Sequence, residues 1–79
     1  MDAYVLIDAE PGIIWELAEA TLKIKGVKKA NAVAGQYDAI VHVEFIKMDD
    51  LGKIIEKIQQ LKGVRRTQTL IAIPPTIRR

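Results

Sequence analysis

The sequence predicts an α+β domain made from two copies of one strand-helix-strand unit. Residues 24–29 (IKGVKK) return as residues 61–66 (LKGVRR), each time after a helix-like stretch and before a β-rich one. The Gly of each copy can take the left-handed conformation that closes a helix, and the Val that follows starts a strand. With right-handed crossovers, the order βαββαβ gives a four-stranded antiparallel sheet with both helices on one face, which is the ferredoxin-like sandwich.

The first unit is expected to begin with a strand at Ala3 to Ala9, because this stretch is apolar and β-branched and Pro11-Gly12 ends it. A helix should follow from about Ile13 to Lys25. Its buried face is set by the repeat, since the residue 37 positions later in the second helix must face the core in the same way. The predicted apolar stripe consists of Ile14, Leu17, Ala18, Thr21 and Ile24 in the first helix and Leu51, Ile54, Ile55, Ile58 and Leu61 in the second.

Two strands are expected to join the units. Val27 to Ala34 and Tyr37 to Ile46 are rich in β-forming residues, and Gly35-Gln36 between them predicts a hairpin. The pattern fits a tight turn and a short loop equally well.

The second helix and the last strand complete the domain. Asp49 is placed to cap the helix, because its carboxylate can accept the N–H groups left free in the first turn. The helix should end at Lys62-Gly63, and the last strand should run from Val64 to Ile73, before Pro74-Pro75 removes two N–H donors. We therefore expect one domain over residues 1–75 and a tail over residues 76–79.

Composition argues against several classes of protein. The chain of 79 residues has no cysteine, and its one histidine, His42, cannot hold a metal without carboxylates, so we expect no disulfide, metal or cofactor. The 12 basic and 10 acidic side chains are mixed along the chain, which is poor support for nucleic-acid binding. No apolar run approaches the roughly 20 residues of a membrane-spanning helix, and the N-terminus lacks the order of a signal peptide. These features predict a soluble cytoplasmic protein whose small core is supplemented by self-association.

Alternation assigns the strand side chains to two faces of the sheet. The face under the helices should hold Val5, Ile7, Tyr37, Ala39, Val41, Val43 and Phe45. The open face should hold Tyr4, Leu6, Asp8, Asp38, Ile40, His42, Glu44, Ile46, Thr67, Thr69, Ile71 and Ile73. A half-apolar open face favours burial against the sheet of an identical copy, in a dimeric α/β barrel-like pairing. Scattered exposed aliphatic residues are the alternative interpretation.

The turn into the third strand and the start of the fourth carry polar groups that suit a free amino acid. Asp38 can pair with the α-ammonium, the Gly35 backbone permits close approach, and Thr67 and Thr69 offer hydroxyls. Apolar neighbours would then select the side chain of the ligand. Taken singly, these residues are also ordinary turn and strand formers, so both interpretations stay open at this level.

The ordered set formed by residues 25–27 (KGV), 34–38 (AGQYD) and 61–69 (LKGVRRTQT) resembles the effector-binding domain of the Lrp/AsnC family of feast/famine transcription regulators. The resemblance covers nearly the whole chain. It implies the βαββαβ fold, pairing of subunits through their sheets, and assembly of dimers into octamers or related rings. It also implies a non-enzymatic role in which an amino acid binds between dimers, at positions that match Gly35, Tyr37, Asp38, Thr67 and Thr69.

Full-length members of that family carry an N-terminal helix-turn-helix domain, whereas this sequence begins at the first strand. The resemblance therefore implies a stand-alone effector domain that does not bind DNA directly and acts through full-length Lrp/AsnC regulators. A bound amino acid would shift the assembly toward the state that it prefers.

Two other functions remain open. A small oligomeric enzyme would use His42 as its base, beside Glu44, but the sequence offers no third group to orient a nucleophile or hold a metal. An RNA-binding module would stack bases on exposed aromatic residues of the sheet, for which only Tyr4 is available. Trp15 matches Gly52 in the repeat and so lies off the apolar stripe, either as an inter-subunit anchor or as a partly covered surface residue.

Overall fold

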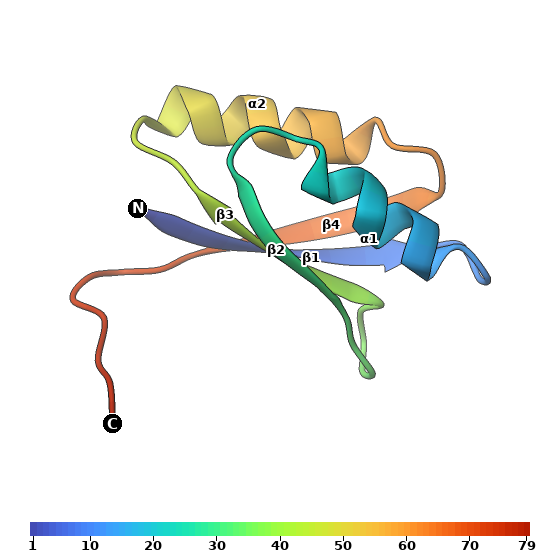
Figure 1. Cartoon of the computed structure of the whole chain (residues 1–79), viewed down its shortest axis with the longest axis horizontal. Coiled ribbons are helices and arrows are strands. Elements are labelled where there is room, and N and C mark those ends of the chain that lie inside the picture. The colour runs from blue at the N-terminus through green and yellow to red at the C-terminus, as the bar shows by residue number, and fades with distance from the viewer.

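The computed structural model describes all residues, 1–79, and repeats one strand-helix-strand unit (Figure 1). The elements are β1 (Asp2–Ala9), α1 (Ile14–Leu22), β2 (Val27–Ala32), β3 (Ala39–Glu44), α2 (Met48–Gln59) and β4 (Val64–Ile71). The strands form one antiparallel sheet in the order β2-β3-β1-β4. Both helices lie on one face, α1 over β2 and β3 and α2 over β4, and the other face is open. The predicted ferredoxin-like fold is confirmed.

The core lies between the sheet and the helices, as the alternation of the strands predicts. Every second residue of β1 is buried, and Ala39, Val41 and Val43 of β3 are fully buried. The helices cover these residues with the predicted stripe, whose buried members are Leu17, Ala18, Thr21, Leu51, Ile54 and Ile58. Burial of each large aliphatic side chain contributes about 1.5–3 kcal/mol, so this layer holds the helices on the sheet.

Each helix is followed by a glycine with positive φ, as the repeat predicts. Gly26 has φ +100° and Gly63 has φ +94°. A Cβ at Gly26 would lie 2.6 Å from Cδ1 of Ile54, and a Cβ at Gly63 would collide with the side chain of Ile13. Both corners therefore need a residue without a side chain.

The helix boundaries differ from the prediction. Both helices end three residues early, at Leu22 and Gln59, because the residues before each glycine form tighter turns with hydrogen bonds between residues three apart. The predicted cap by Asp49 is wrong, since the N-cap residue is Lys47 and no side chain makes a capping bond. Asp49 lies instead in the first turn, where its charge interacts favourably with the positive end of the helix dipole.

The strands are shorter than predicted around the hairpin. Residues 33–38 form a loop, closed by a backbone hydrogen bond of 2.9 Å between its first and last residues, so the connection at Gly35-Gln36 is the loop rather than the tight turn. β3 and β4 each stop two residues early, at Glu44 and Ile71. Beyond β4 the chain leaves the body of the domain as an extended segment (Figure 1).

The faces of β4 are the reverse of the prediction. Thr69 pairs with Val5 and Thr67 with Ile7, and both partners are fully buried beneath the helices. Directly paired residues of antiparallel strands project to the same face, so Thr67, Thr69 and Ile71 face the helix side rather than the open side. β4 is an edge strand with both faces partly exposed, so its sequence lacks the apolar alternation that would fix the orientation. Its open-face residues are Arg66, Gln68 and Leu70.

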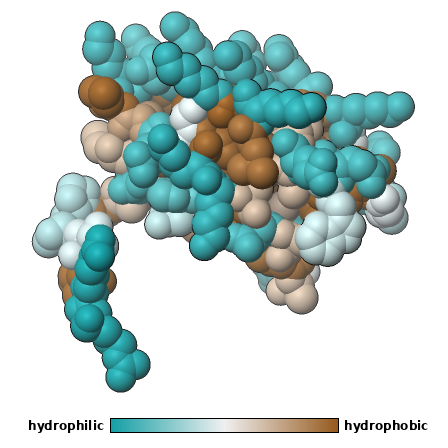
Figure 2. Space-filling view, viewed as in Figure 1, coloured by the Kyte–Doolittle hydropathy of each residue, from teal (hydrophilic) through white to brown (hydrophobic).

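The outer surfaces of the two helices are mostly hydrophilic. Teal side chains cover the upper side of the molecule in Figure 2, over α1 and α2. Trp15 and Leu22 are large apolar exceptions on α1, at 69% and 50% exposed, so Trp15 lies off the apolar stripe as predicted. Neither helix is long and apolar enough to cross a membrane.

Candidate ligand-binding site

The loop between β2 and β3 brings Asp38 to the end of β1. Its Oδ2 accepts the backbone N–H of Ala9 at 2.8 Å, and its own N–H donates to the carbonyl of Ile7 at 2.8 Å. The pairing of β1 with β3 ends at Ile7 and Ala39, so the carboxylate satisfies an N–H of β1 that lies beyond the end of this ladder. Asp38 therefore has a structural role, while its second oxygen, Oδ1, makes no hydrogen bond within the chain.

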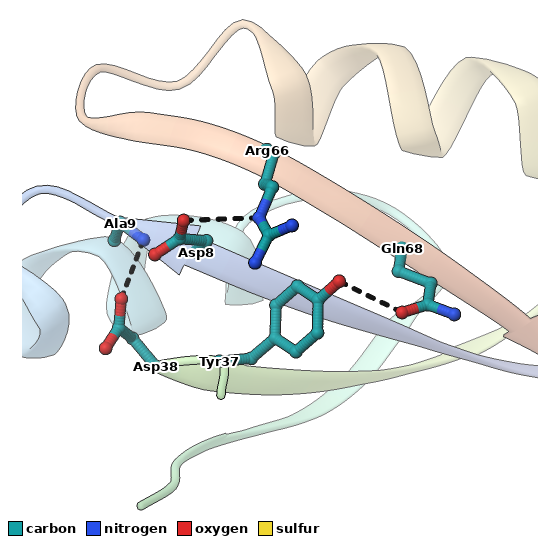
Figure 3. Close-up of polar contacts among 6 residues, drawn as sticks. All are labelled: Asp8, Ala9, Tyr37, Asp38, Arg66 and Gln68. Atoms are coloured by element: carbon teal, nitrogen blue, oxygen red, sulfur yellow. Dashed lines mark hydrogen bonds and ion pairs between the residues drawn. The ribbon is translucent and has the colours of Figure 1, made fainter. Parts of the chain in front are cut away.

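Tyr37 lies across the open face of the sheet, where the sequence predicted it beneath the helices (Figure 3). Its hydroxyl donates to Oε1 of Gln68 at 3.0 Å, and the guanidinium of Arg66 lies 5.1 Å from the centre of its ring. Both partners belong to β4, so the side chain spans β1. The predicted orientation is wrong because the regular alternation of β3 begins only at Ala39, after the loop.

Arg66 also pairs with Asp8 of β1, with 3.3 Å between Nε and Oδ2 (Figure 3). Asp8, Tyr37, Arg66 and Gln68 thus form one group, the Tyr37 cluster, at the hairpin end of the open face. The side chain of Arg66 is 63% exposed, and such a pair contributes at most about 1 kcal/mol to stability. The ion pair in this cluster is therefore weak in a single chain.

The five predicted site residues do not converge on one point in a single chain. Gly35 lies in the exposed part of the loop, and an added Cβ would meet no atom within 4 Å. Tyr37 and Asp38 lie at the hairpin end of the sheet. Thr67 and Thr69 lie on the helix side of β4, where Oγ1 of Thr67 accepts a hydrogen bond from Nε2 of Gln59 at 3.1 Å. The sheet therefore separates the threonines from the Tyr37 hydroxyl.

Three neighbours of Tyr37 were not predicted from the sequence, namely Asp8, Arg66 and Gln68. The relevant sequence pattern is in β4, where Arg66 and Gln68 alternate with Thr67 and Thr69 and so project to the opposite face. Only the register of β4 against β1 shows which of the two pairs shares a face with Asp8.

The three main surface hollows, of about 260 to 440 Å³, lie elsewhere. The hollow of about 440 Å³ lies between α1 and the α2–β4 corner and is lined by Leu17, Leu61 and Glu16 among others. None of the three is lined by the five predicted site residues. In a single chain the predicted site is therefore an open surface, and a second chain would be needed to enclose a ligand.

Asp2 is a polar neighbour of His42 that the sequence did not reveal. Nε2 of His42 lies 2.8 Å from Oδ1 of Asp2, and the histidine ring stacks on Tyr4. The hollow beside His42 measures about 260 Å³, below the range of about 300–1,000 Å³ that is usual for small-molecule sites. One face of Tyr4 is covered by the histidine ring. The geometry therefore strengthens neither the enzymatic nor the RNA-binding alternative.

The fold is that of a small ferredoxin-like α+β domain, with the Tyr37 cluster on the open face of its sheet rather than in a closed cavity. Residues 2–79 match the family described as the Lrp/AsnC ligand binding domain. The chain belongs to this family, whose curated members include transcription regulators.

Curated relatives extend beyond the length of this chain. An HTH-type transcriptional regulator from Pyrococcus furiosus is 39% identical over 74 residues, which cover 89% of this chain and 49% of the relative. The chain thus spans about half the length of the regulators that it matches. A shorter match to a homocitrate synthase from Saccharolobus islandicus is 40% identical over 50 residues and covers 63% of this chain and 11% of the enzyme.

Solved structures share the fold over nearly the whole chain. TTHA0845 from Thermus thermophilus has a TM-score of 0.90 at 31% identity, with 98% of each chain covered. PHS023 from Pyrococcus horikoshii has a TM-score of 0.83 at 37% identity, over 94% of this chain and 90% of its own. AsnC from E. coli has a TM-score of 0.82 at 26% identity, over 99% of this chain and 54% of its own.

Proposed function

We propose that this chain is an amino-acid-sensing module that acts in transcription regulation and catalyses no reaction. The observation that carries the proposal is the match of residues 2–79 to a ligand-binding domain of transcription regulators. The chemistry at the hairpin end of the sheet supports an amino acid as the ligand. Carboxylates and a guanidinium lie close together there, and they complement an α-ammonium and an α-carboxylate.

The proposed site uses Gly35, Tyr37 and Asp38 of one chain and Thr67 and Thr69 of another. A ligand that contacts all five residues must lie between chains, because in one chain the sheet separates the threonines from Tyr37. Oδ1 of Asp38 is available for the ammonium, and hydroxyls on the edge strand β4 can donate to the ligand carboxylate. Binding between dimers, the arrangement that the family resemblance implies, would meet these requirements.

Pairing through the open faces would build the dimers. The centre of this face is apolar, with Tyr4 at 37% and Leu70 at 47% exposed beside the half-buried Leu6 and Ile40. Burial of such a patch against an identical sheet is favourable because apolar surface leaves water. The dimers would then join into octamers or related rings, with ligands at the junctions.

The module would act through full-length Lrp/AsnC regulators. In those relatives the matching segment occupies about half of the chain, so a regulator presents a similar sheet with which this chain can assemble. A similar segment also matches part of a biosynthetic enzyme, as expected for a sensing domain that works in different contexts. A shared ligand would favour one mixed assembly only by as much as it prefers that state.

Calorimetric titration with each of the common amino acids tests the proposal. Wild type should bind at least one of them, and Asp38→Asn should weaken that binding at least about tenfold, because hydrogen bonds to charged groups contribute about 1.5–3 kcal/mol. Asn keeps an oxygen that can accept the Ala9 N–H, so the variant should retain the fold.

Asp49→Asn is the matched control, since it removes an exposed carboxylate from the first turn of α2 and should leave the affinity unchanged. The proposal would be contradicted if wild type bound no amino acid, or if Asp38→Asn bound as tightly as wild type.

A further inference from the structure

We propose that Asp2, His42 and Glu44 form a binding site for a divalent transition-metal ion such as Zn²⁺. The potential ligand atoms of the three side chains all lie within 4.8 Å of one another. The site is separate from the Tyr37 cluster, because Asp2 and Asp8 lie at opposite ends of β1 and a strand rises about 3.3 Å per residue, which places them roughly 20 Å apart. The proposed amino-acid site uses none of these residues.

Antiparallel pairing of β1 with β3 brings the three side chains together. Asp2 lies directly opposite Glu44, and His42 lies opposite Tyr4, one step further along the same face. The contact of 2.8 Å between Nε2 of His42 and Oδ1 of Asp2 shows that the imidazole already points toward the carboxylates. Sequence spacing reveals only the His42 and Glu44 part of this set, because Asp2 comes from another strand.

The surrounding structure holds two of the three ligands in place. The carbonyl of Asp2 accepts the N–H of Ala72, and the carbonyl of Met1 accepts the N–H of Phe45, each at 2.9 Å. The ring of Tyr4 stacks on the histidine ring, with 5.1 Å between the ring centres and 17° between the planes. The backbone of Asp2 and the orientation of the imidazole are thus fixed before an ion binds, which lowers the cost of ordering the site.

The donor set favours a transition metal over magnesium or calcium. One imidazole nitrogen and two carboxylates can serve as the three protein ligands of a Zn²⁺ ion that keeps a water in its fourth position. Mg²⁺ and Ca²⁺ prefer sites made of oxygen alone. Neighbouring ligands of a tetrahedral zinc ion lie about 3.3 Å apart, so the present spacing closes by rotation of the carboxylates, and Glu44 is exposed and free to rotate.

Metal binding would replace the hydrogen bond between the histidine and Asp2. That contact requires a proton between Nε2 and Oδ1, since two lone pairs would repel. Coordination through Nε2 moves this proton to Nδ1 or to solvent, and the ion then interacts with both atoms. The side chains of His42 and Asp2 are 27% and 40% exposed in a single chain, and Asp2 lies at the end of β1, so the ion can enter from the rim of paired sheets.

Titration of the untagged wild-type chain with zinc chloride, by calorimetry in a buffer that does not chelate zinc, tests the site. We expect one ion per chain, and a loss of affinity of at least about tenfold in His42→Gln and in Glu44→Gln, because each removes a ligand. Glu44→Gln changes an exposed side chain without changing its size, so it should not unfold the domain. Asp49→Asn should bind zinc as wild type does.

NMR of the histidine ring gives a second readout. The chain has one histidine and no cysteine, so a zinc-dependent shift of histidine ring signals can come only from His42. Equal zinc affinity in wild type, His42→Gln and Glu44→Gln, or ring signals that do not move at saturating zinc, would overturn the proposal. Amino-acid titration of the same variants separates the two sites, since it should not change when zinc binding is lost.

Discussion

At the scale of single residues, glycines allow the chain to turn from each helix into the strand that follows. Gly63 has φ +94°, and the side chain of Ile13 occupies the space where its Cβ would lie. Gly52 is in the interior of α2, and a Cβ there would meet no atom within 4 Å. The same substitution at these two positions should therefore have opposite effects.

Gly63→Ala should lower the free energy of unfolding by more than about 1 kcal/mol, because the left-handed conformation costs a residue with a side chain about 1–2 kcal/mol and Ile13 must also move. Gly52→Ala, the control, should raise the free energy of unfolding by about 0.5–1 kcal/mol, as expected for an exposed helix interior. Urea unfolding of the two variants measures both effects. A Gly63→Ala chain as stable as wild type would show that the corner does not need glycine.

At the scale of elements, the hydrogen bond from Ala9 N–H to Asp38 joins the end of the β2–β3 loop to the end of β1. Asp38→Ala leaves this N–H without its partner and should lower the free energy of unfolding by about 1–3 kcal/mol. Asp38→Asn should cost less, because it keeps an oxygen acceptor. Urea unfolding without amino acids measures the difference, and equal stability of both variants and wild type would rule out this role for Asp38.

Elements with one strongly buried face could be predicted from the sequence. In β1 every second residue, Ala3 to Ala9, is buried, and in α2 the residues Leu51, Ile54 and Ile58 recur with the helical period. Only one strand register buries the apolar residues of β1, since a shift by one residue would expose all of them. The apolar stripe of α2 likewise determines which face of the helix packs on the sheet. These elements therefore followed the prediction in type and in orientation.

The edge strand and the site could not be predicted in the same way. Both faces of β4 are partly exposed, so the sequence pattern did not indicate that Thr67 and Thr69 face the helices. Tyr37 lies in a loop, where alternation does not apply. The contacts of Asp8 with Arg66 and of Asp2 with His42 join residues 58 and 40 positions apart, and they depend on the register of paired strands.

At the scale of the whole molecule, the proposed pairing of subunits depends on the open face of the sheet. Leu70 at 47% exposed and Tyr4 at 37% exposed lie near its centre, where water would contact apolar surface in a single chain. Charged groups lie toward both ends of β1, at Asp2 and at Asp8. A second copy of the sheet would cover the apolar centre and leave the charged ends near the rim.

Leu70→Glu should therefore weaken the dimer, because it places a charge in the apolar centre of the paired faces. Leu22→Glu is the matched control, since Leu22 on α1 is 50% exposed but lies on the helix side of the molecule. Sedimentation equilibrium of the two variants compares their dissociation constants. If Leu22→Glu dissociated the chain and Leu70→Glu did not, the subunits would pair through the helices instead.

Light scattering of wild type, with and without a mixture of the common amino acids, tests the central claim most directly. A sensing module that assembles through its sheet should have at least twice the chain mass of 8.8 kDa, and the mixture should change that mass by stabilising contacts between dimers. A mass of 8.8 kDa that is the same with and without amino acids would contradict both the assembly and the ligand.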